Sequence, residues 1–324
     1  MQKSVYLSLC LALALLFLAA LPPTKAWSDS PNPSLVIIDT GIDSSLPIFQ
    51  NRLISEVCIL DWYLCPNGSN FQEGMNAATL RGSIANINGF DHGTQMASIA
   101  VNAYPELKFI FMRVIANNMW GNRLPVTNEN IVKALTWVQQ NREKYNIRAV
   151  AMSQGNHQLL PGYKYCPVVP GVQKAITQLK LDGVAVFFPV GNQADKKRID
   201  WPACIPDSIA VGAINDKDEI TSYTNMDYFN TDMYALGNIQ AIVPGGRSVN
   251  ASGTSVSTQI AAVQWIQFAN KYPQASYSQI FQALRTSGKL VFDINFRFGR
   301  KVDLVAALAQ YEKIFITGNV ASAA

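Results

Sequence analysis

Histidine is scarce in this sequence, because His92 and His157 are the only two imidazoles in 324 residues. An enzyme that works near neutral pH without a metal or cofactor usually moves protons through an imidazole. Acid–base chemistry of that kind is therefore confined to two positions. His92 precedes a Gly-Thr pair at the start of an expected helix and is the stronger candidate. We interpret His157 as a histidine at the surface or at the rim of a substrate site.

Cysteine is also sparse. Cys10 lies inside an apolar N-terminal run, and the other four cysteines are Cys58, Cys65, Cys166 and Cys204. An even number of cysteines in an exported chain suggests disulfides, and four cysteines allow three connectivities. The short loop between Cys58 and Cys65 would permit a local bridge, which would leave Cys166 to pair with Cys204. A zinc site built from four cysteines is the weaker alternative, because the sequence has no Cys-x-x-Cys pair.

Neither sign of charge is in large excess, with 26 Lys and Arg against 22 Asp and Glu. The net charge of +4 falls to +2 if residues 1–26 are removed, because they contain Lys3 and Lys25 and no acidic residue. This balance gives no reason to expect nucleic acid as a partner. No run after the N-terminal segment is long and apolar enough to cross a bilayer, so we expect no stable membrane association.

The first 26 residues have the pattern of a cleavable secretory signal peptide. Lys3 supplies positive charge, an apolar run follows, and Thr24 and Ala26 place small residues at the −3 and −1 positions of a cut before Trp27. An uncleaved N-terminal anchor is the alternative. We therefore predict that the chain is secreted or periplasmic, and we expect a monomer with a mature length of about 298 residues.

Short apolar runs alternate with segments of helical periodicity along the rest of the chain. This alternation predicts one α/β domain over residues 27–324, with three layers: a mainly parallel sheet and helices on both of its faces. In such sheets ligands bind beyond the carboxyl ends of the strands. The expected strands are residues 35–38, 107–114, 147–152, 184–190 and 208–213, and the expected helices are residues 129–144, 171–181, 254–269 and 276–287.

Five polar residues lie where such a site would form. Asp39, Ser153 and Asn192 follow expected strands, while His92 and Ser255 lie near the starts of expected helices. A serine at a helix N-terminus is close to free N–H groups and to the positive end of the helix dipole, and both stabilise a developing oxyanion. Each residue alone has a simpler interpretation as a turn or a helix cap. Their combination indicates a catalytic site.

The order Asp39, His92, Asn192, Ser255 resembles that of the subtilisin-like serine proteases, or subtilases. The resemblance extends over residues 34–311, nearly the whole chain after the expected signal peptide. The segments that carry it are Val36–Ser45, His92-Gly93-Thr94, Ala185–Asn192, Trp201-Pro202-Ala203, Ile209–Ala213, Gly253-Thr254-Ser255 and Phe298–Asp303.

This resemblance implies a secreted endopeptidase that hydrolyses polypeptides without a cofactor. We also expect no obligatory metal, because the loop that builds the family's strong calcium site is missing here. Ser255 would be the nucleophile and His92 the general base, and Asp39 would orient the imidazole and stabilise its charged form. The side-chain amide of Asn192 and the backbone N–H of Ser255 would bind the oxyanion.

The resemblance also assigns residues to substrate binding. Ser153-Gln154-Gly155 corresponds to the family segment that pairs with an extended substrate backbone. Pro189 stands where a small residue usually lines the primary specificity pocket, so we expect a narrower pocket.

Four positions near the expected site depart from the usual family pattern. Gln95 and Ser98 replace His and Gly in the histidine helix, while Ser257 and Gln259 replace Ala and Pro in the nucleophile helix. None of these changes removes a reacting group. They leave open the alternative of a catalytically degenerate subtilase-fold protein that only binds.

We also expect two features of the family to be absent from this chain. Only about a dozen residues separate Trp27 from Asp39, so we expect no N-terminal prodomain. The chain also passes quickly through residues 101–104, where a loop would otherwise build a strong calcium site. An α/β hydrolase is a weaker hypothesis still, because its triad runs in another order and its Gly-x-Ser-x-Gly elbow is missing.

Overall fold

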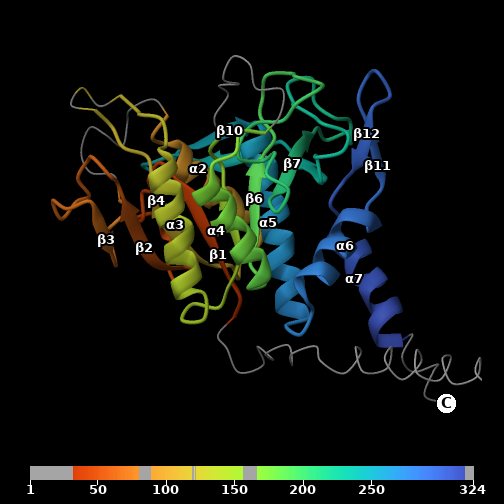
Figure 1. The fold of residues 1–324 in the computed structure, drawn as a ribbon, viewed down its shortest axis with the longest axis horizontal. Coiled ribbons are helices and arrows are strands. Elements are labelled where there is room, and N and C mark those ends of the chain that lie inside the picture. The colour runs from red at the N-terminus through yellow and green to blue at the C-terminus, as the bar shows by residue number, and fades with distance from the viewer. Residues whose placement is uncertain (1–31, 80–88, 119, 121, 156–165, 318–324) are drawn as a thin grey trace, which may run out of the picture.

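The computed structural model describes residues 32–79, 89–118, 120, 122–155 and 166–317, and an eight-stranded sheet lies at its centre (Figure 1). The strand order is β3-β2-β4-β1-β5-β6-β7-β8. Every neighbouring pair is parallel except β3 with β2. The strands are β1 (Ser34–Asp39), β2 (Leu53–Ile59), β3 (Phe71–Glu73), β4 (Lys108–Arg113), β5 (Ile147–Met152), β6 (Ala185–Pro189), β7 (Ile209–Ile214) and β8 (Met233–Leu236).

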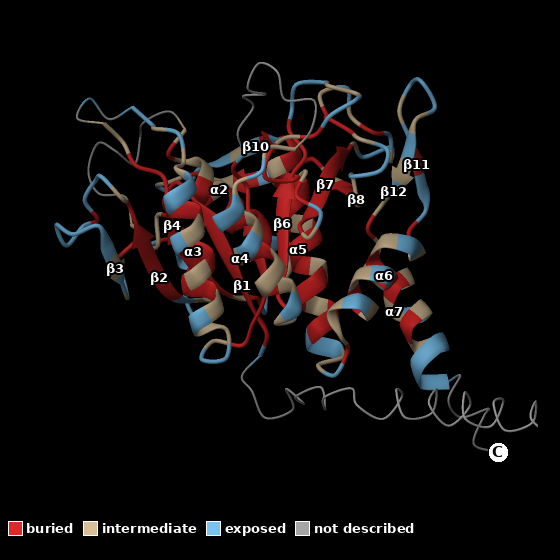
Figure 2. Cartoon of the chain, viewed as in Figure 1, coloured by how far each residue is buried: buried red, intermediate tan, exposed pale blue. Residues whose placement is uncertain are grey.

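Helices cover both faces of this sheet, which confirms the predicted three-layer α/β fold. One face packs against α2 (His92–Ala103) and α5 (Thr254–Lys271), and the other against α3 (Asn128–Asn141) and α4 (Pro170–Leu181). Figure 2 shows the central strands buried, the edge strand β3 largely exposed and the helices buried along their inner sides. The remaining helices are α6 (Tyr277–Ser287), α7 (Leu304–Tyr311), the 3-10 turn η1 (Pro47–Phe49) and the π-helical turn η3 (Glu312–Thr317).

Strand β1 shows why the central strands appear in the sequence as nearly continuous apolar runs. Leu35 and Ile37 belong to the core beneath α2 and α5, whereas Val36 and Ile38 belong to the core beneath α3 and α4. All four side chains are buried because successive side chains point to opposite faces and both faces are covered.

Two small antiparallel sheets complete the fold. Strands β9 (Asn238–Ile242) and β10 (Ser248–Ser252) pair with each other just before α5. Strands β11 (Leu290–Phe292) and β12 (Phe298–Arg300) form a hairpin that projects beside β8 (Figure 2).

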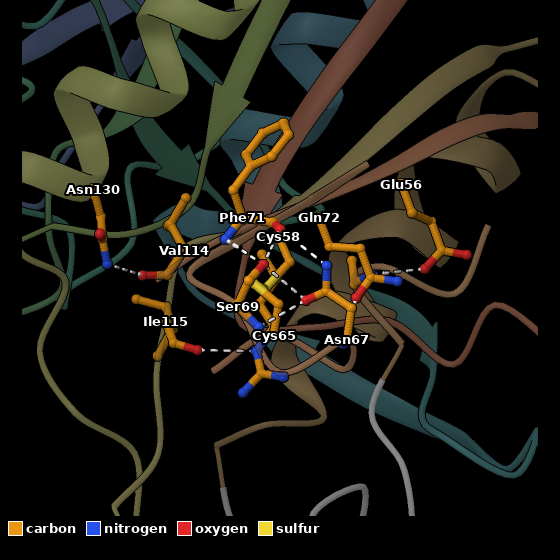
Figure 3. The surroundings of a disulfide bond; sticks show 12 residues. Glu56, Cys58, Cys65, Asn67, Ser69, Phe71, Gln72, Val114, Ile115 and Asn130 are labelled. Carbon is orange, nitrogen blue, oxygen red and sulfur yellow. Dashed lines mark hydrogen bonds between the residues drawn. A yellow bond between two sulfur atoms is a disulfide. The ribbon is translucent and has the colours of Figure 1, made fainter. Parts of the chain in front are cut away.

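The four cysteines beyond residue 26 form two disulfides. Cys58 is joined to Cys65 with an S–S distance of 2.05 Å, which closes the turn that follows β2 (Figure 3). Cys166 is joined to Cys204 at 2.01 Å, which ties the segment before α4 to the segment after β6. These are the two pairs expected if the short loop after Cys58 closes a local bridge with Cys65.

Candidate active site

The carboxylate of Asp39 lies at the carboxyl end of the central strand β1 and is completely buried. Burial alone would raise its pKa. The charge and the hydrogen bond of His92, the backbone N–H of Thr40 (2.7 Å) and the charge of Arg123 outweigh that effect, so its pKa lies below the usual range. Asp39 is therefore a carboxylate at neutral pH, although no water reaches it.

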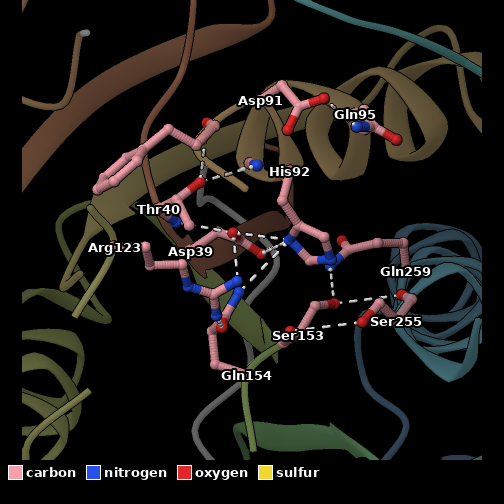
Figure 4. Close-up of polar contacts among 12 residues, drawn as sticks. Asp39, Thr40, Asp91, His92, Gln95, Arg123, Ser153, Gln154, Ser255 and Gln259 are labelled. Carbon is pink, nitrogen blue, oxygen red and sulfur yellow. Dashed lines mark hydrogen bonds and ion pairs between the residues drawn. The ribbon is translucent and has the colours of Figure 1, made fainter. Parts of the chain in front are cut away.

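His92 is the first residue of α2 and faces this carboxylate (Figure 4). Its Nδ1 lies 2.8 Å from Oδ1 and 2.9 Å from Oδ2 of Asp39. An ionised carboxylate only accepts hydrogen bonds, so Nδ1 must carry a proton. In the neutral ring Nε2 is then free to accept a proton, which is the tautomer that a general base needs.

The residues around His92 bring the start of α2 close to the end of β1. A Cβ on Gly93 would lie 2.3 Å from the carbonyl oxygen of Gly41 and 2.6 Å from the ring of Phe111, so only glycine fits there. The hydroxyl of Thr40 accepts a hydrogen bond from the N–H of Gly93 at 3.0 Å. The Asp-Thr-Gly and His-Gly-Thr motifs therefore contact each other directly.

A second side chain that contacts Asp39 is that of Gln154, which was expected only to line the substrate site. Its Nε2 donates to Oδ1 of Asp39 at 3.0 Å, and its Oε1 accepts a hydrogen bond from Arg123 (Figure 4). Gln154 is buried. The result is a continuous hydrogen-bonded chain from Arg123 through Gln154 and Asp39 to His92. Arg123 lies in a loop without a recognisable motif, so nothing in the sequence pointed to it.

Ser255 occupies the second position of α5, directly after the turn at Gly253. Its hydroxyl donates to the carbonyl oxygen of Ser153 at 3.4 Å, and the hydroxyl of Ser153 donates to the carbonyl oxygen of Ser255 at 3.2 Å. Among the described residues no hydrogen bond joins Ser255 to His92. Attack by Ser255 on a substrate therefore requires its side chain to rotate towards the imidazole.

Three of the four unusual residues in the two helices have local hydrogen-bond partners, whereas the buried hydroxyl of Ser257 has none within the described ranges. Nε2 of Gln259 donates to the hydroxyl of Ser153 at 2.9 Å, while its buried Oε1 has no partner within the described ranges. The hydroxyl of Ser98 accepts a hydrogen bond from the N–H of Ile242 at 2.8 Å, and the amide of Gln95 donates to Asp91 at 2.8 Å. These side chains therefore alter the support of the site and not its reacting groups.

Asn192 lies in the turn after β6, and its orientation follows from its partners. Its side-chain oxygen accepts hydrogen bonds from the backbone N–H of Thr254 at 2.9 Å and from the Thr254 hydroxyl at 3.0 Å. Because an N–H can donate only to an acceptor, the atom at that position must be the oxygen. The NH₂ group is then the remaining side-chain donor of Asn192, a residue that lines the cavity described below.

These side chains line one cavity of about 270 Å³. Its lining comes from six separate segments of the chain and includes His92, Asn192, Ser255 and the expected substrate-binding residues. Asp200 was not among the expected site residues, although it directly precedes the family-like Trp201-Pro202-Ala203 segment. The lining residues are His92, Arg123, Ser153, Gln154, Gly155, Pro189, Gly191, Asn192, Asp200, Thr254 and Ser255.

Two further findings concern metal binding and membrane-spanning helices. Within the described ranges no group of three or more His, Cys, Asp or Glu side chains could hold a metal ion. The same part of the chain contains no helix long and apolar enough to cross a membrane. His157 and residues 1–26 lie outside the described residues.

Comparison with known proteins identifies the family of this chain. The model of the subtilase family, described as peptidase S8, matches residues 30–300. Subtilisin NAT of Bacillus subtilis subsp. natto is 26% identical over 86% of this chain and 66% of its own length. Subtilisin of Bacillus pumilus is 26% identical over 86% of this chain and 91% of its own length. The chain thus spans slightly less than two thirds of the first of these relatives.

Solved structures show the same fold. A protease from Pseudoalteromonas arctica superposes with a TM-score of 0.68 at 16% identity, covering 89% of this chain and 93% of its own. The family match covers most of the chain. The chain therefore belongs to the subtilase family of serine-type endopeptidases.

Proposed function

We propose that this protein is an exported serine endopeptidase that hydrolyses peptide bonds of polypeptide substrates. The observation that carries the proposal is the contact of Nδ1 of His92 with the buried carboxylate of Asp39 at 2.8 Å, in the wall of a cavity that also contains Ser255 and Asn192. A base with a fixed tautomer, a hydroxyl and an amide donor around one space are the groups that acyl transfer requires.

In the proposed mechanism, His92 Nε2 removes the proton from the Ser255 hydroxyl as its oxygen attacks the scissile carbonyl. Asp39 stabilises the imidazolium that forms, and the Asn192 NH₂ group with the Ser255 N–H binds the oxyanion. The imidazolium then protonates the leaving amine, and water hydrolyses the acyl-enzyme by the same steps.

Substrate binding would also prepare the nucleophile. An extended substrate that pairs with the Ser153–Gly155 edge would present backbone N–H groups to its carbonyls. A substrate N–H on the Ser153 carbonyl would compete with the Ser255 hydroxyl, which donates to the same oxygen at 3.4 Å. The displaced hydroxyl would then be available to His92.

The alternative is a subtilase-fold protein that binds polypeptides without cleaving them. The specific observation in its favour is that Ser255 donates to Ser153 and not to His92. The buried, unpartnered oxygen of Gln259 near the nucleophile points the same way. Catalytic hydrogen bonds are often long or misaligned before substrate binds, so we favour the enzyme.

The test is covalent labelling of protein recovered from the culture medium with a fluorophosphonate probe. We expect one adduct at Ser255 on a chain that begins at Trp27, and no adduct on Ser255→Ala. The matched control is Ser278→Ala, which removes an exposed hydroxyl and should label normally. The Ser255→Ala variant should lose about 10⁴-fold or more in kcat on a peptide substrate. Folded wild-type protein that neither labels nor cleaves would establish the binding-only alternative.

A further inference from the structure

Arg113 is a cation at the carboxyl end of β4 that the proposed reaction does not use. Only 6% of this residue is exposed to solvent. Buried charges in proteins are normally paired, because removing a charge from water is costly. Burial lowers the pKa of Arg113 to about 10, and no carboxylate in the described part of the chain counteracts this shift. The guanidinium is therefore charged at neutral pH and has no counter-charge among the described residues.

The acidic residues on the two neighbouring strands are engaged elsewhere. Asp39 stands beside Arg113 in the register of β1 and β4, but its carboxylate contacts His92. The buried carboxylate of Glu56 on β2 accepts hydrogen bonds from two backbone N–H groups and from the hydroxyl of Thr79. Residues 80–88, 119, 121 and 156–165 include no Asp or Glu. An anion from outside the chain could therefore supply the counter-charge.

The guanidinium of Arg113 also has donors available for such an anion. Its Nε donates to the carbonyl oxygen of Ile115 at 3.1 Å, and its Nη2 donates to Oδ1 of Asn117 at 3.0 Å. Arginine has five N–H donors, so three remain. None of these three donates to a residue within the described ranges.

Arg113 lines a cavity of about 280 Å³ that shares no lining residue with the cavity of the candidate active site. The apolar wall of this second cavity comes from the turn after β2 and consists of Leu60, Tyr63, Leu64 and Pro66. The disulfide after β2 crosslinks this turn (Figure 3), so the wall is held in place independently of a ligand. The cavity also lies at the carboxyl ends of parallel strands, where ligands bind in sheets of this kind.

We propose that this cavity is a binding site for a carboxylate attached to a small apolar group, with Arg113 as its counter-charge. A carboxylate matches the planar fork of a guanidinium, which can donate two parallel hydrogen bonds to it. The apolar group would pack against the wall formed by the turn after β2. A free organic acid and a carboxylate of a polypeptide present the same chemistry, so either can be the source. The site does not depend on the proposed peptidase function.

The test is a series of NMR titrations of the full chain carrying Ser255→Ala, followed through the backbone N–H signals of Leu60 and Asn117. The probes are 3-phenylpropionate, the peptide acetyl-Ala-Ala-Phe with a free carboxyl group, and the uncharged amide of each. We expect the acids to bind with a Kd of about 1 mM or lower, as for other ligands of this size. Each acid should bind at least about tenfold more tightly than its amide, because only the acid can form a charge-assisted pair.

Two substitutions test whether binding occurs in this cavity. Arg113→Met removes the charge and should abolish the preference for the acids. Leu64→Glu places a like charge on the rim and should weaken binding of the acids about tenfold. The matched control is Leu181→Glu, which makes the same change at an exposed leucine of α4 outside the cavity and should bind as the parent chain does. Because Leu64 is 67% exposed, Leu64→Glu decides the matter even if Arg113→Met fails to fold.

The outcomes separate the source of the carboxylate from the existence of the site. Selective binding of 3-phenylpropionate alone would support the site and identify a free organic acid as its ligand, whereas selective binding of the peptide acid alone would support it and identify a polypeptide. Equal affinity for each acid and its amide overturns the proposal, and so does the absence of saturable binding for all four probes. Binding of the acids that Leu64→Glu leaves unchanged overturns it as well. Labelling of Ser255 by a fluorophosphonate is a separate measurement, so none of these results bears on the peptidase.

Discussion

At the scale of single residues, the site depends on keeping a buried carboxylate ionised and correctly oriented. Asp39 is buried and has three hydrogen-bonding partners: the imidazole of His92, the N–H of Thr40 and the amide of Gln154. Gln154 in turn is held by Arg123. A carboxylate surrounded in this way has few alternative orientations, so the ring of His92 is held by it in one tautomer.

The residue-scale prediction concerns Gln154→Met, which keeps the length of the side chain and removes its hydrogen bonds. Losing one hydrogen bond to a charged group costs about 1.5–3 kcal/mol, so we expect kcat to fall by roughly 10- to 100-fold. KM should change little, because the side chain points to Asp39 and the backbone of Gln154 remains. Steady-state kinetics on one peptide substrate measure both constants, with the exposed Gln50→Met as control. A rise in KM at unchanged kcat would instead assign Gln154 to substrate contact.

At the scale of elements, the turn between β6 and Asn192, the proposed oxyanion donor, tolerates few substitutions. Gly191 has φ +103°, a conformation that side chains with a Cβ rarely adopt. A Cβ there would also lie 2.1 Å from Asp200 and 2.3 Å from the amide of Asn225. Backbone conformation and space therefore both require glycine at this position.

We predict that Gly191→Ala loses activity and at least about 3 kcal/mol of stability, since strain and overpacking add. Gly183→Ala is the matched control, because Gly183 also has a positive φ (+80°) but an added Cβ would meet nothing within 4 Å. Gly183→Ala should lower the free energy of unfolding by only about 1–2 kcal/mol, from backbone strain alone. Urea unfolding of both variants in the Ser255→Ala background avoids self-digestion. Equal losses of stability in the two variants would mean that steric overlap with Asp200 does not restrict substitution at Gly191.

The elements also show which parts of the fold could be predicted from the sequence. The five expected strands and four expected helices are all present, because each is a largely apolar run or has a clear helical period. Strand β2 was missed since Ser55 and Glu56 interrupt its apolar pattern. Glu56 is fully buried, and its carboxylate accepts hydrogen bonds from the N–H groups of Asn76 and Ala78. Only the folded chain supplies those partners.

The residues of the candidate site also fall into those that the sequence predicted and those that it did not. Motifs predicted the cluster of Asp39, His92, Asn192 and Ser255, because the spacing of strands and helices brings strand ends to one edge. Arg123 and Asp200 were not predicted. Each reaches the cavity from a loop, and a loop has no periodicity from which its position could be derived.

At the scale of the whole molecule, the buried charges carry a stability cost that depends on pH. Asp232 precedes β8, and its side chain is 16% exposed. Burial raises its pKa to about 6, although the N–H of Ala210 (2.9 Å) and the guanidinium of Arg285 (3.7 Å) oppose the shift. In the unfolded chain an aspartate has a pKa of about 3.9. Between roughly pH 4 and pH 6 the folded state therefore binds more protons than the unfolded state, and stability falls as pH rises through this window.

Removing the charge should remove this dependence. Asp232→Asn keeps an oxygen for the N–H of Ala210 and cannot ionise, so it should match the parent chain near pH 4. At pH 8 it should be more stable by about 2–3 kcal/mol, because a difference of about two pKa units is worth that much free energy. Urea unfolding at pH 4, 6 and 8 in the Ser255→Ala background measures the difference, and Asp216→Asn corrects for the change in net charge. A gain of the same size at all three pH values would show that packing, and not ionisation of Asp232, is responsible.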